Sequence, residues 1–534
     1  MSIRYKTHLK IGVSLFAAGL AIAGTAEART KPHTLSQAEM QAQILAQTKT
    51  MLDAQKAEFE QAEAAKQAQI DALQAKVDTL TTQLQATQTK VAETPPPPTV
   101  AQLAPQVAAA LPKPDATAGM KKGVASIASS DGAFTMAVHG VMQMDAASYD
   151  QDKSLPAAVT ARDLNSGTNL RRARLGVNGK LFGSFDYNIL AEFGGSGAED
   201  AGRIQELWVQ YSGYDHAKVR VGAFPPLLGL EDAASTNTQP FMERPAASEV
   251  ARSLAGGDYR MGAAVFGNGD RWLYSVALTG NTVSTLNTQA TAFTAANTDE
   301  QLGVAARVAA TPLRGFDWLV HVGANYSAVI NPGDAGAAAA TRYPIQLRDR
   351  PELRVDGTRL VDTGALNSQS ASATGVELAG QYKSLFAQGE AFSYQVKRLN
   401  PAAGVTDPEF SGWYVEGGWS LTGEARKYNT ATAAFDGVVP RDNFDPKNGK
   451  WGAWELVARY STLDLNYHDG ATLAADRVLG GKQDISSLGL DWQLNTAVRF
   501  VFEGQSVRID RLNSAAAEIG QKYSTFAARS QFSF

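Results

Sequence analysis

The chain has 534 residues, a formal net charge of -4 and no cysteine, which excludes a disulfide framework, a cysteine-ligated metal and a cysteine nucleophile. The acidic balance argues against nucleic acid as a partner, because proteins that bind nucleic acid usually carry a clear basic excess. A mean hydropathy of -0.21 with 48 glycines does not fit a bundle of membrane helices and indicates apolar residues spread singly among polar ones.

Residues 1–28 have the features of a secretory signal peptide. Basic residues precede an apolar run over 11–24, and an A-x-A cleavage site ends at Ala28. The apolar run is shorter than the roughly 20 residues that a membrane-spanning helix needs, which disfavours an N-terminal anchor. We therefore expect residues 1–28 to be removed during export, so that the mature chain begins at Arg29.

Residues 35–92 lack glycine and proline and are rich in alanine, glutamine, lysine and glutamate, which predicts a long helix. The second half of this segment carries a heptad seam whose residues are Ile70, Leu73, Val77, Leu80, Leu84 and Val91. A single helix cannot bury such a stripe, so the pattern predicts a self-associating coiled coil; the alternative is a solvated helical spacer. Branched residues at a with leucine at d favour two strands in a parallel coiled coil.

Residues 93–122 follow as a proline-rich segment, with four prolines in a row at 95–98. Proline fixes φ and removes a backbone donor, so we predict a semi-rigid, extended linker that ends the helix.

The apolar period changes to two over residues 123–534. Leu175 and Val177 alternate with Arg174 and Asn178, for example, and glycine- or asparagine-containing turns separate many runs of this kind. The predicted fold is an all-β transmembrane barrel of about 16 antiparallel strands, preceded by a periplasmic α-helical coiled coil.

Three features favour a membrane barrel over a soluble sandwich. Tight turns alternate with long segments, such as 225–258, 282–300 and 331–373, as periplasmic turns alternate with extracellular loops in outer-membrane barrels. Aromatic residues cluster near the predicted strand ends, as interfacial girdles require. The chain ends on an alternating strand with Phe534, a C-terminal aromatic of the kind that the barrel assembly machinery recognises. A sheet in lipid must close, because an open edge would leave backbone groups unpaired.

Several motifs in the barrel segment resemble the phosphate-selective porin O and P family. They are residues 170–182 (LRRARLGVNGKLF), 221–231 (VGAFPPLLGLE), 241–244 (FMER), 350–352 (RPE), 361–364 (VDTG), 421–426 (LTGEAR) and 452–461 (GAWELVARYS). The resemblance implies a trimer of 16-stranded barrels in the outer membrane, often with an N-terminal coiled coil. Where the seam of the helix favours a dimer, we give more weight to the trimer, since a large barrel interface outweighs a short apolar seam.

The candidate pore-lining and anion-binding residues are basic side chains at the strand positions that alternate with the lipid-facing ones. If Leu175 and Val177 face lipid, basic residues of the same strand face water, and the long segment 225–258 follows the fifth strand, where many porins fold a loop into the pore. The candidates are Arg172, Arg174, Lys180, Lys218, Arg220, Arg244, Arg252, Arg260 and Arg307. The alternative is that acidic neighbours neutralise them, for example Glu231 or Glu243 beside Arg244. Arg342, Arg348, Arg350, Arg354 and Arg359 could form a basic extracellular funnel, or a solvated loop.

The predicted function is passive diffusion of small solutes through an outer-membrane porin, with a bias toward anions and a possible preference for phosphate or polyphosphate. The sequence contains no zinc-protease, nucleophile-elbow or phosphate-loop motif, so we expect neither catalysis nor a metal or cofactor. The expected partners are outer-membrane lipid, the barrel assembly machinery, small anions and further copies of the chain. The alternative function is an envelope tether, in which the periplasmic coiled coil contacts peptidoglycan and the pore is non-selective.

Overall fold

The computed structural model describes residues 37–92, 115–121, 123–151, 163–195, 202–255, 259–282, 301–332 and 345–534. The chain divides into two units, Met1–Leu111 and Pro112–Phe534. The predicted signal peptide, residues 93–114 of the predicted linker, and Arg342 lie outside the described residues.

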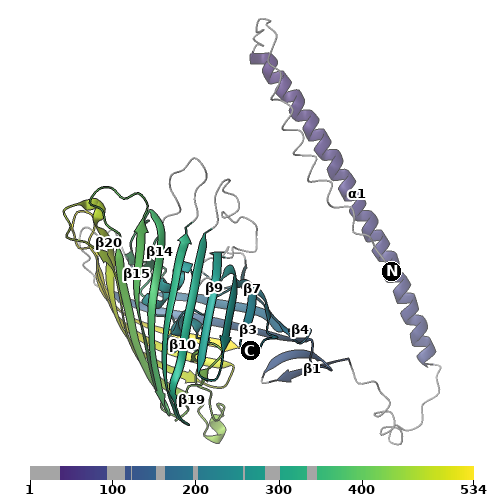
Figure 1. Ribbon diagram of the computed structural model, residues 1–534. Helices are drawn as coiled ribbons and strands as arrows, with labels where there is room; N and C mark the ends of the chain where they lie inside the picture. Colours follow the sequence, from purple (N-terminus) through teal and green to yellow (C-terminus); the bar gives the residue numbers. More distant parts are fainter. Residues whose placement is uncertain are drawn as a thin grey trace, which may run out of the picture. The chain divides into compact units, whose positions relative to one another are not determined.

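The first unit contains one long helix, α1 (Gln37–Ala92), within the segment predicted to be helical (Figure 1). The seam residues from Ile70 to Leu84 are exposed on this helix: Val77 is 58% exposed and Leu84 is 62% exposed. The structure therefore shows the helix, whereas the coiled coil stays a prediction. None of the described helices has a stretch long and apolar enough to cross a membrane.

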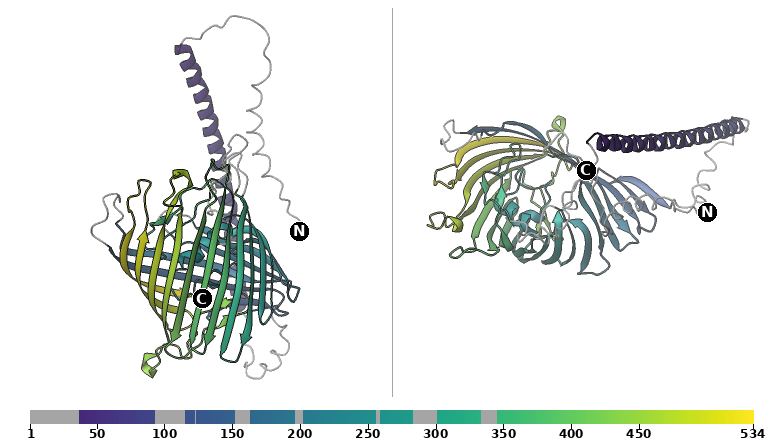
Figure 2. Two further views of the ribbon diagram at one scale, coloured as in Figure 1. Left: turned by 60° about the vertical axis from the view of Figure 1, so that its left-hand side comes forward. Right: turned by 90° about the horizontal axis from the view of Figure 1, so that it is seen from above.

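The second unit is built on an 18-stranded antiparallel sheet, of which β1 and β2 form a separate N-terminal hairpin and the other sixteen strands form a closed barrel (Figures 1 and 2). The barrel closes because the last strand pairs with the first, with Phe526 opposite Ser148 and Arg529 opposite Asp145. The predicted strand number is confirmed. The barrel strands are β3 (Thr135–Gln151), β4 (Gly167–Leu181), β5 (Phe185–Glu192), β6 (Arg203–Tyr211), β7 (Lys218–Phe224), β8 (Arg260–Asn268), β9 (Trp272–Thr282), β10 (Leu302–Arg314), β11 (Trp318–Asn331), β14 (Ser368–Tyr382), β15 (Leu385–Arg398), β16 (Glu409–Ser420), β19 (Ala453–Tyr467), β20 (Val478–Gln493), β21 (Val498–Asp510) and β22 (Gln521–Ser533).

The alternating pattern of the sequence decides which face of each strand meets lipid. Leu175 on β4 is 52% exposed and Val276 on β9 is 50% exposed, so both face outward. Inward neighbours such as Arg172 and Ser275 are each 3% exposed. Apolar residues thus cover the outside, where lipid needs them, and polar residues fill the inside.

The hairpin of β1 (Ala116–Lys121) and β2 (Val124–Ser129) continues the sheet beyond the C-terminal strand. β2 pairs with the start of β3, with Ile127 opposite Met136, whereas β22 pairs with β3 only from Val141 onward. β1 therefore falls inside the span predicted as linker, and the barrel proper begins at Thr135 rather than at residue 123. The small residues of β1 give no clear apolar alternation, which is why the sequence pattern did not predict this strand.

Two loops at the long-loop end fold into the barrel. The β7–β8 loop (residues 225–259) contains α3 (Leu230–Ala233) and α4 (Ala246–Ala255), and α4 packs against six barrel strands from β10 to β19. Val250 and Ala251 of α4 are buried in this contact. The β11–β14 loop, described from residue 345, contains β12 (Arg348–Asp349) and β13 (Val361–Asp362) and packs on the same helix.

One connection at the short-turn end departs from the predicted tight turns. Residues 421–452 join β16 to β19 and contain β17 (Tyr428–Asn429), β18 (Ala434–Phe435) and the short helix η1 (Pro446–Asn448). Phe435 is buried in a cluster with Leu230 of the β7–β8 loop. The interior is therefore narrowed from both ends of the barrel.

Candidate functional site

The first cavity of the barrel interior measures about 520 Å³ and lies among β4, β5, β6 and the two infolded loops. Of the described residues on its wall, three are acidic: Glu192, Glu249 and Asp349. Ten of them are arginines: Arg171, Arg172, Arg174, Arg203, Arg244, Arg252, Arg348, Arg350, Arg354 and Arg359. The described part of the lining therefore has a formal excess of seven positive charges. Low-dielectric walls of one sign concentrate counter-ions, so this cavity attracts anions.

A second cavity of about 400 Å³ lies further toward the short-turn end and is bordered by His139 and Phe534. It shares Arg174, Arg244 and Arg252 with the first cavity, together with Thr236 and Tyr259. These five residues mark the place where the two cavities meet. Glu206 and Asp232 oppose the three arginines in the second cavity, so the positive potential is concentrated on the long-loop side.

A β-bulge in β4 brings two consecutive arginines into the interior. Arg172 pairs with Gln143 of β3 and Leu170 pairs with Met144, so Arg171 is the extra residue between them. A bulge re-aims a side chain that strict alternation would point the other way. The alternation of the sequence puts Arg171 on the lipid-facing side of the strand. Because of the bulge it faces the interior instead, so the sequence did not predict it as an interior residue.

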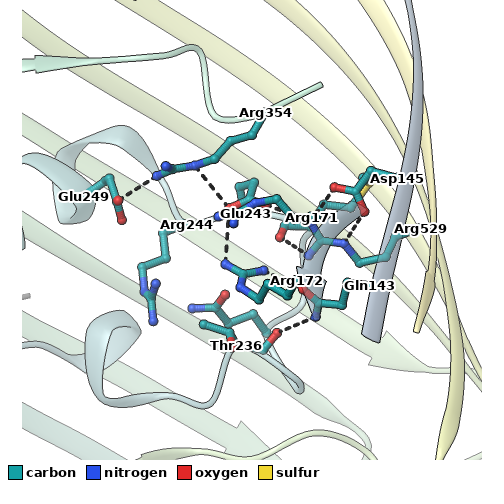
Figure 3. Close-up of polar contacts among 12 residues, drawn as sticks. Gln143, Asp145, Arg171, Arg172, Thr236, Glu243, Arg244, Glu249, Arg354 and Arg529 are labelled. Atoms are coloured by element: carbon teal, nitrogen blue, oxygen red, sulfur yellow. Dashed lines mark hydrogen bonds and ion pairs between the residues drawn. The ribbon is translucent and has the colours of Figure 1, made fainter. Parts of the chain in front are cut away.

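Glu243 of the β7–β8 loop lies within ion-pair distance of four arginines (Figure 3). Its carboxylate is 2.6 Å from Nε of Arg171 and 2.7 Å from Nη2 of Arg529. Nη2 of Arg172 is 3.6 Å away and Nε of Arg354 is 3.5 Å away. Burial would raise the pKa of Glu243, but attraction to Arg171, Arg172 and Arg529 outweighs it and holds the pKa well below its usual range.

Arg244 and Arg252, predicted to line the pore from the loop that follows the fifth strand, both border the two cavities. Arg252 is held firmly, since its guanidinium lies 2.6 Å from Asp232 and 3.3 Å from Glu249. Arg244 is held loosely: Asp232 is 3.8 Å away, and Nε of Arg244 has no hydrogen-bond partner among the described residues. Neither Glu231 nor Glu243, the predicted neutralising partners, forms an ion pair with Arg244 in the described part of the chain. Arg244 thus borders both cavities and keeps at least one donor, Nε, that no described residue occupies.

The predicted basic funnel lies in the β11–β14 loop, where Arg348, Arg350, Arg354 and Arg359 all line the first cavity. Burial, followed by repulsion from Arg354 and Arg359, lowers the pKa of Arg350 to about 10. Arg350 thus lies among like charges. Arg354 of the same group is compensated, since it pairs with Glu249 at 2.6 Å and lies 3.5 Å from Glu243.

Five of the nine predicted residues border neither of these cavities. Lys180 is exposed and pairs with Asp186 at 2.7 Å, Lys218 lies 6.0 Å from the ring of Phe266, and Arg220 stacks at 4.0 Å over the ring of Trp208. These three residues lie toward the short-turn end, whereas the arginine-rich cavity lies toward the long loops.

Arg260 and Arg307 face inward but hold the infolded segments. Arg260 donates to the carbonyl of Ser253 at the end of α4. Arg307 is 1% exposed, pairs with Glu377 at 2.7 Å and donates to the carbonyls of Thr432 and Ala433. The alternation of the sequence predicted that both arginines face inward. Only the tertiary fold shows that α4 and the 421–452 connection lie over them.

A closed barrel with a lipid-facing apolar surface and a narrowed, charged interior makes this chain an outer-membrane porin. The chain belongs to the phosphate-selective porin O and P family, whose model matches residues 136–534. The family resemblance drawn from the sequence motifs is confirmed.

The chain is similar to Porin O of Pseudomonas aeruginosa, with 25% identity over 412 residues that cover 74% of this chain and 87% of that protein. It is 29% identical over 427 residues to an uncharacterized protein of Caulobacter vibrioides, covering 78% of each. Among solved structures, the anion-selective porin from Comamonas acidovorans is 12% identical with a TM-score of 0.44, covering 75% of this chain and all of that one. OmpT of Vibrio cholerae is 11% identical with a TM-score of 0.44, covering 75% of this chain and 98% of that one.

Proposed function

We propose that this porin is an anion-preferring diffusion channel whose interior binds oxyanions such as phosphate weakly and at several positions. The observation that carries the proposal is the first cavity, where ten arginines face three carboxylates among the residues that the structure describes. This excess raises the local concentration of anions and lowers that of cations. The description of the family, phosphate-selective porin O and P, supports the choice of phosphate.

Guanidinium groups suit phosphate better than a point charge does, because their planar fork donates two parallel hydrogen bonds to an oxyanion. Arg350 and Arg359 of the β11–β14 loop line the first cavity only, whereas Arg174 and Arg244 line both cavities. An anion can therefore pass from one guanidinium to the next without leaving the positive field. Several weak sites of this kind permit conduction, since a single tight site would trap the ion.

Titration of the chloride current with inorganic phosphate in a planar bilayer tests this function. Phosphate is expected to reduce the chloride current of the purified protein in a saturable manner, because both anions compete for the same arginines. An unchanged chloride current at all phosphate concentrations would contradict an oxyanion-binding interior.

We further propose that the protein assembles as a trimer, with α1 as a coiled coil in the periplasm after removal of residues 1–28. The 56 residues of α1 correspond to about 84 Å of helix, long enough to extend well beyond the membrane. The exposed seam around Val77 and Leu84 supports burial against other copies. Phe534 at the end of β22 supports delivery by the barrel assembly machinery.

Cross-linking of the intact protein distinguishes the proposed trimer from the dimer that the seam alone favours. The exposed helix also supports a second candidate function, an envelope tether that contacts peptidoglycan. Sedimentation of the protein with purified peptidoglycan sacculi tests the tether, and a variant that lacks residues 37–92 is the control. Equal sedimentation of both proteins would contradict the tether.

A further inference from the structure

We infer that Glu243 is a tethered competitor of the permeating anion. Its carboxylate occupies a cluster of four guanidinium groups, so that phosphate passes along the neighbouring arginines without being trapped. The inference rests on the proposed function and concerns the strength of anion binding rather than its existence.

The four guanidinium groups around Glu243 come from three separate parts of the fold. Arg171 and Arg172 lie on β4, Arg529 lies on β22, and Arg354 lies in the β11–β14 loop (Figure 3). Such convergence on two oxygen atoms is the donor arrangement that a protein would need to hold a free oxyanion. Here the occupant is covalently attached to the β7–β8 loop.

The hydrogen bonds of Glu243 are those of a bound anion. Oε1 accepts from Nε of Arg171 at 2.6 Å and from Nη2 of Arg529 at 2.7 Å, while Oε2 accepts from Nη2 of Arg171 at 2.9 Å. The side chain of Glu243 is 5% exposed. Nε of Arg172 and Nε of Arg354 have no hydrogen-bond partner among the described residues, so the cluster keeps donor capacity that one carboxylate does not fill.

Glu243 does not border the first cavity, but Arg171, Arg172 and Arg354 do. An anion in the cavity therefore meets these arginines on one side while Glu243 holds them on the other. Without the carboxylate, a buried cluster of this kind would draw in a counter-ion, because unpaired buried charges are costly. Glu243 supplies that counter-ion in advance and lowers the affinity of the cluster for the permeating anion.

Arg529 shows that the cluster is a buried network and not a single surface ion pair. Its guanidinium also makes a two-pronged contact with Asp145, at 2.7 Å to each carboxylate oxygen. Arg529 therefore stays in place when Glu243 is altered, and so does Arg354, which pairs with Glu249 at 2.6 Å. The vacated site would keep its geometry and become available to phosphate.

The test is the phosphate titration of the chloride current with Glu243→Gln. The variant is expected to bind phosphate at least about tenfold more tightly, seen as a lower half-blocking concentration, with a smaller residual current at saturation. Glu192→Gln is the matched control. It removes the same charge from the wall of the first cavity, but the ion-pair partner of Glu192 among the described residues is a single arginine, Arg174, so its half-blocking concentration should fall by less than about threefold.

Three results would overturn the inference. If Glu243 only fastened the loop, its removal would free the loop, and the current would rise with an unchanged or higher half-blocking concentration. An unchanged titration would equally exclude competition. If Glu243→Gln fails to give a folded barrel, Glu243→Asp, which shortens the side chain by one methylene, should show an intermediate tightening, and wild-type behaviour of that variant overturns the inference. Absence of phosphate block in the wild-type protein would instead contradict the proposed function.

Discussion

Arg244→Ala is the substitution whose effect on anion binding follows most directly from the structure. Arg244 borders both cavities, its side chain is 10% exposed, and its nearest carboxylate, Asp232, is 3.8 Å away. One unit charge at about 4 Å stabilises a monovalent anion by about 1 kcal/mol in bulk water and by about 4 kcal/mol at an effective dielectric constant of about 20. Because Arg244 borders solvent-accessible cavities, a value toward the lower end, about 1.4 to 2 kcal/mol, is appropriate.

This free energy corresponds to an increase of about 10-fold to 30-fold in the half-blocking phosphate concentration. The assay is the phosphate titration of the chloride current, and Arg508→Ala is the control, since Arg508 is an exposed arginine that pairs with Asp510. Arg244→Lys should fall between wild type and Arg244→Ala, because it keeps the charge but loses the fork. Equal half-blocking concentrations for Arg244→Ala and Arg508→Ala would refute the assignment of Arg244 to the anion path.

Two further predictions concern stability and pH. Arg307→Ala leaves Glu377 as an uncompensated buried carboxylate, so it should lower the free energy of unfolding by about 3 to 5 kcal/mol. Denaturant unfolding of the folded barrel measures this loss, and a change below about 1 kcal/mol would contradict it. Burial, and then the nearby charge of Glu249, raises the pKa of Asp349 to about 7. Protonation of Asp349 adds to the positive excess, so anion preference should rise as the pH falls from about 8 to about 6. Asp349→Asn should have the higher anion preference at every pH in this range. If the variant kept the pH response of the wild-type protein, Asp349 would not be the group responsible for it.

The strand phases were predictable from the sequence because lipid imposes a strict rule on alternate residues. Leu175 had to face outward, and the same count placed Arg172 and Arg174 inside, where the structure has them. The rule fails where the ladder is interrupted. The bulge at Arg171 shifts the phase by one residue, and no residue in the local sequence marks it.

The partners of the candidate residues could not be predicted, because they come from distant segments. Arg307 on β10 pairs with Glu377 on β14 and is covered by residues of the 421–452 connection. Glu243 and Arg354 meet only after two loops have folded into the same interior. Alternation gives the direction of a strand side chain, whereas loop placement depends on packing of the whole barrel.

The central claim is that the interior prefers anions, and the reversal potential of the purified protein in a KCl gradient tests it most directly. An anion-preferring pore is more permeable to chloride than to potassium, so chloride flowing down its gradient should make the dilute side negative relative to the concentrated side. The arginine-rich first cavity predicts this sign. A dilute side that becomes positive, or a reversal potential of zero, would contradict the account.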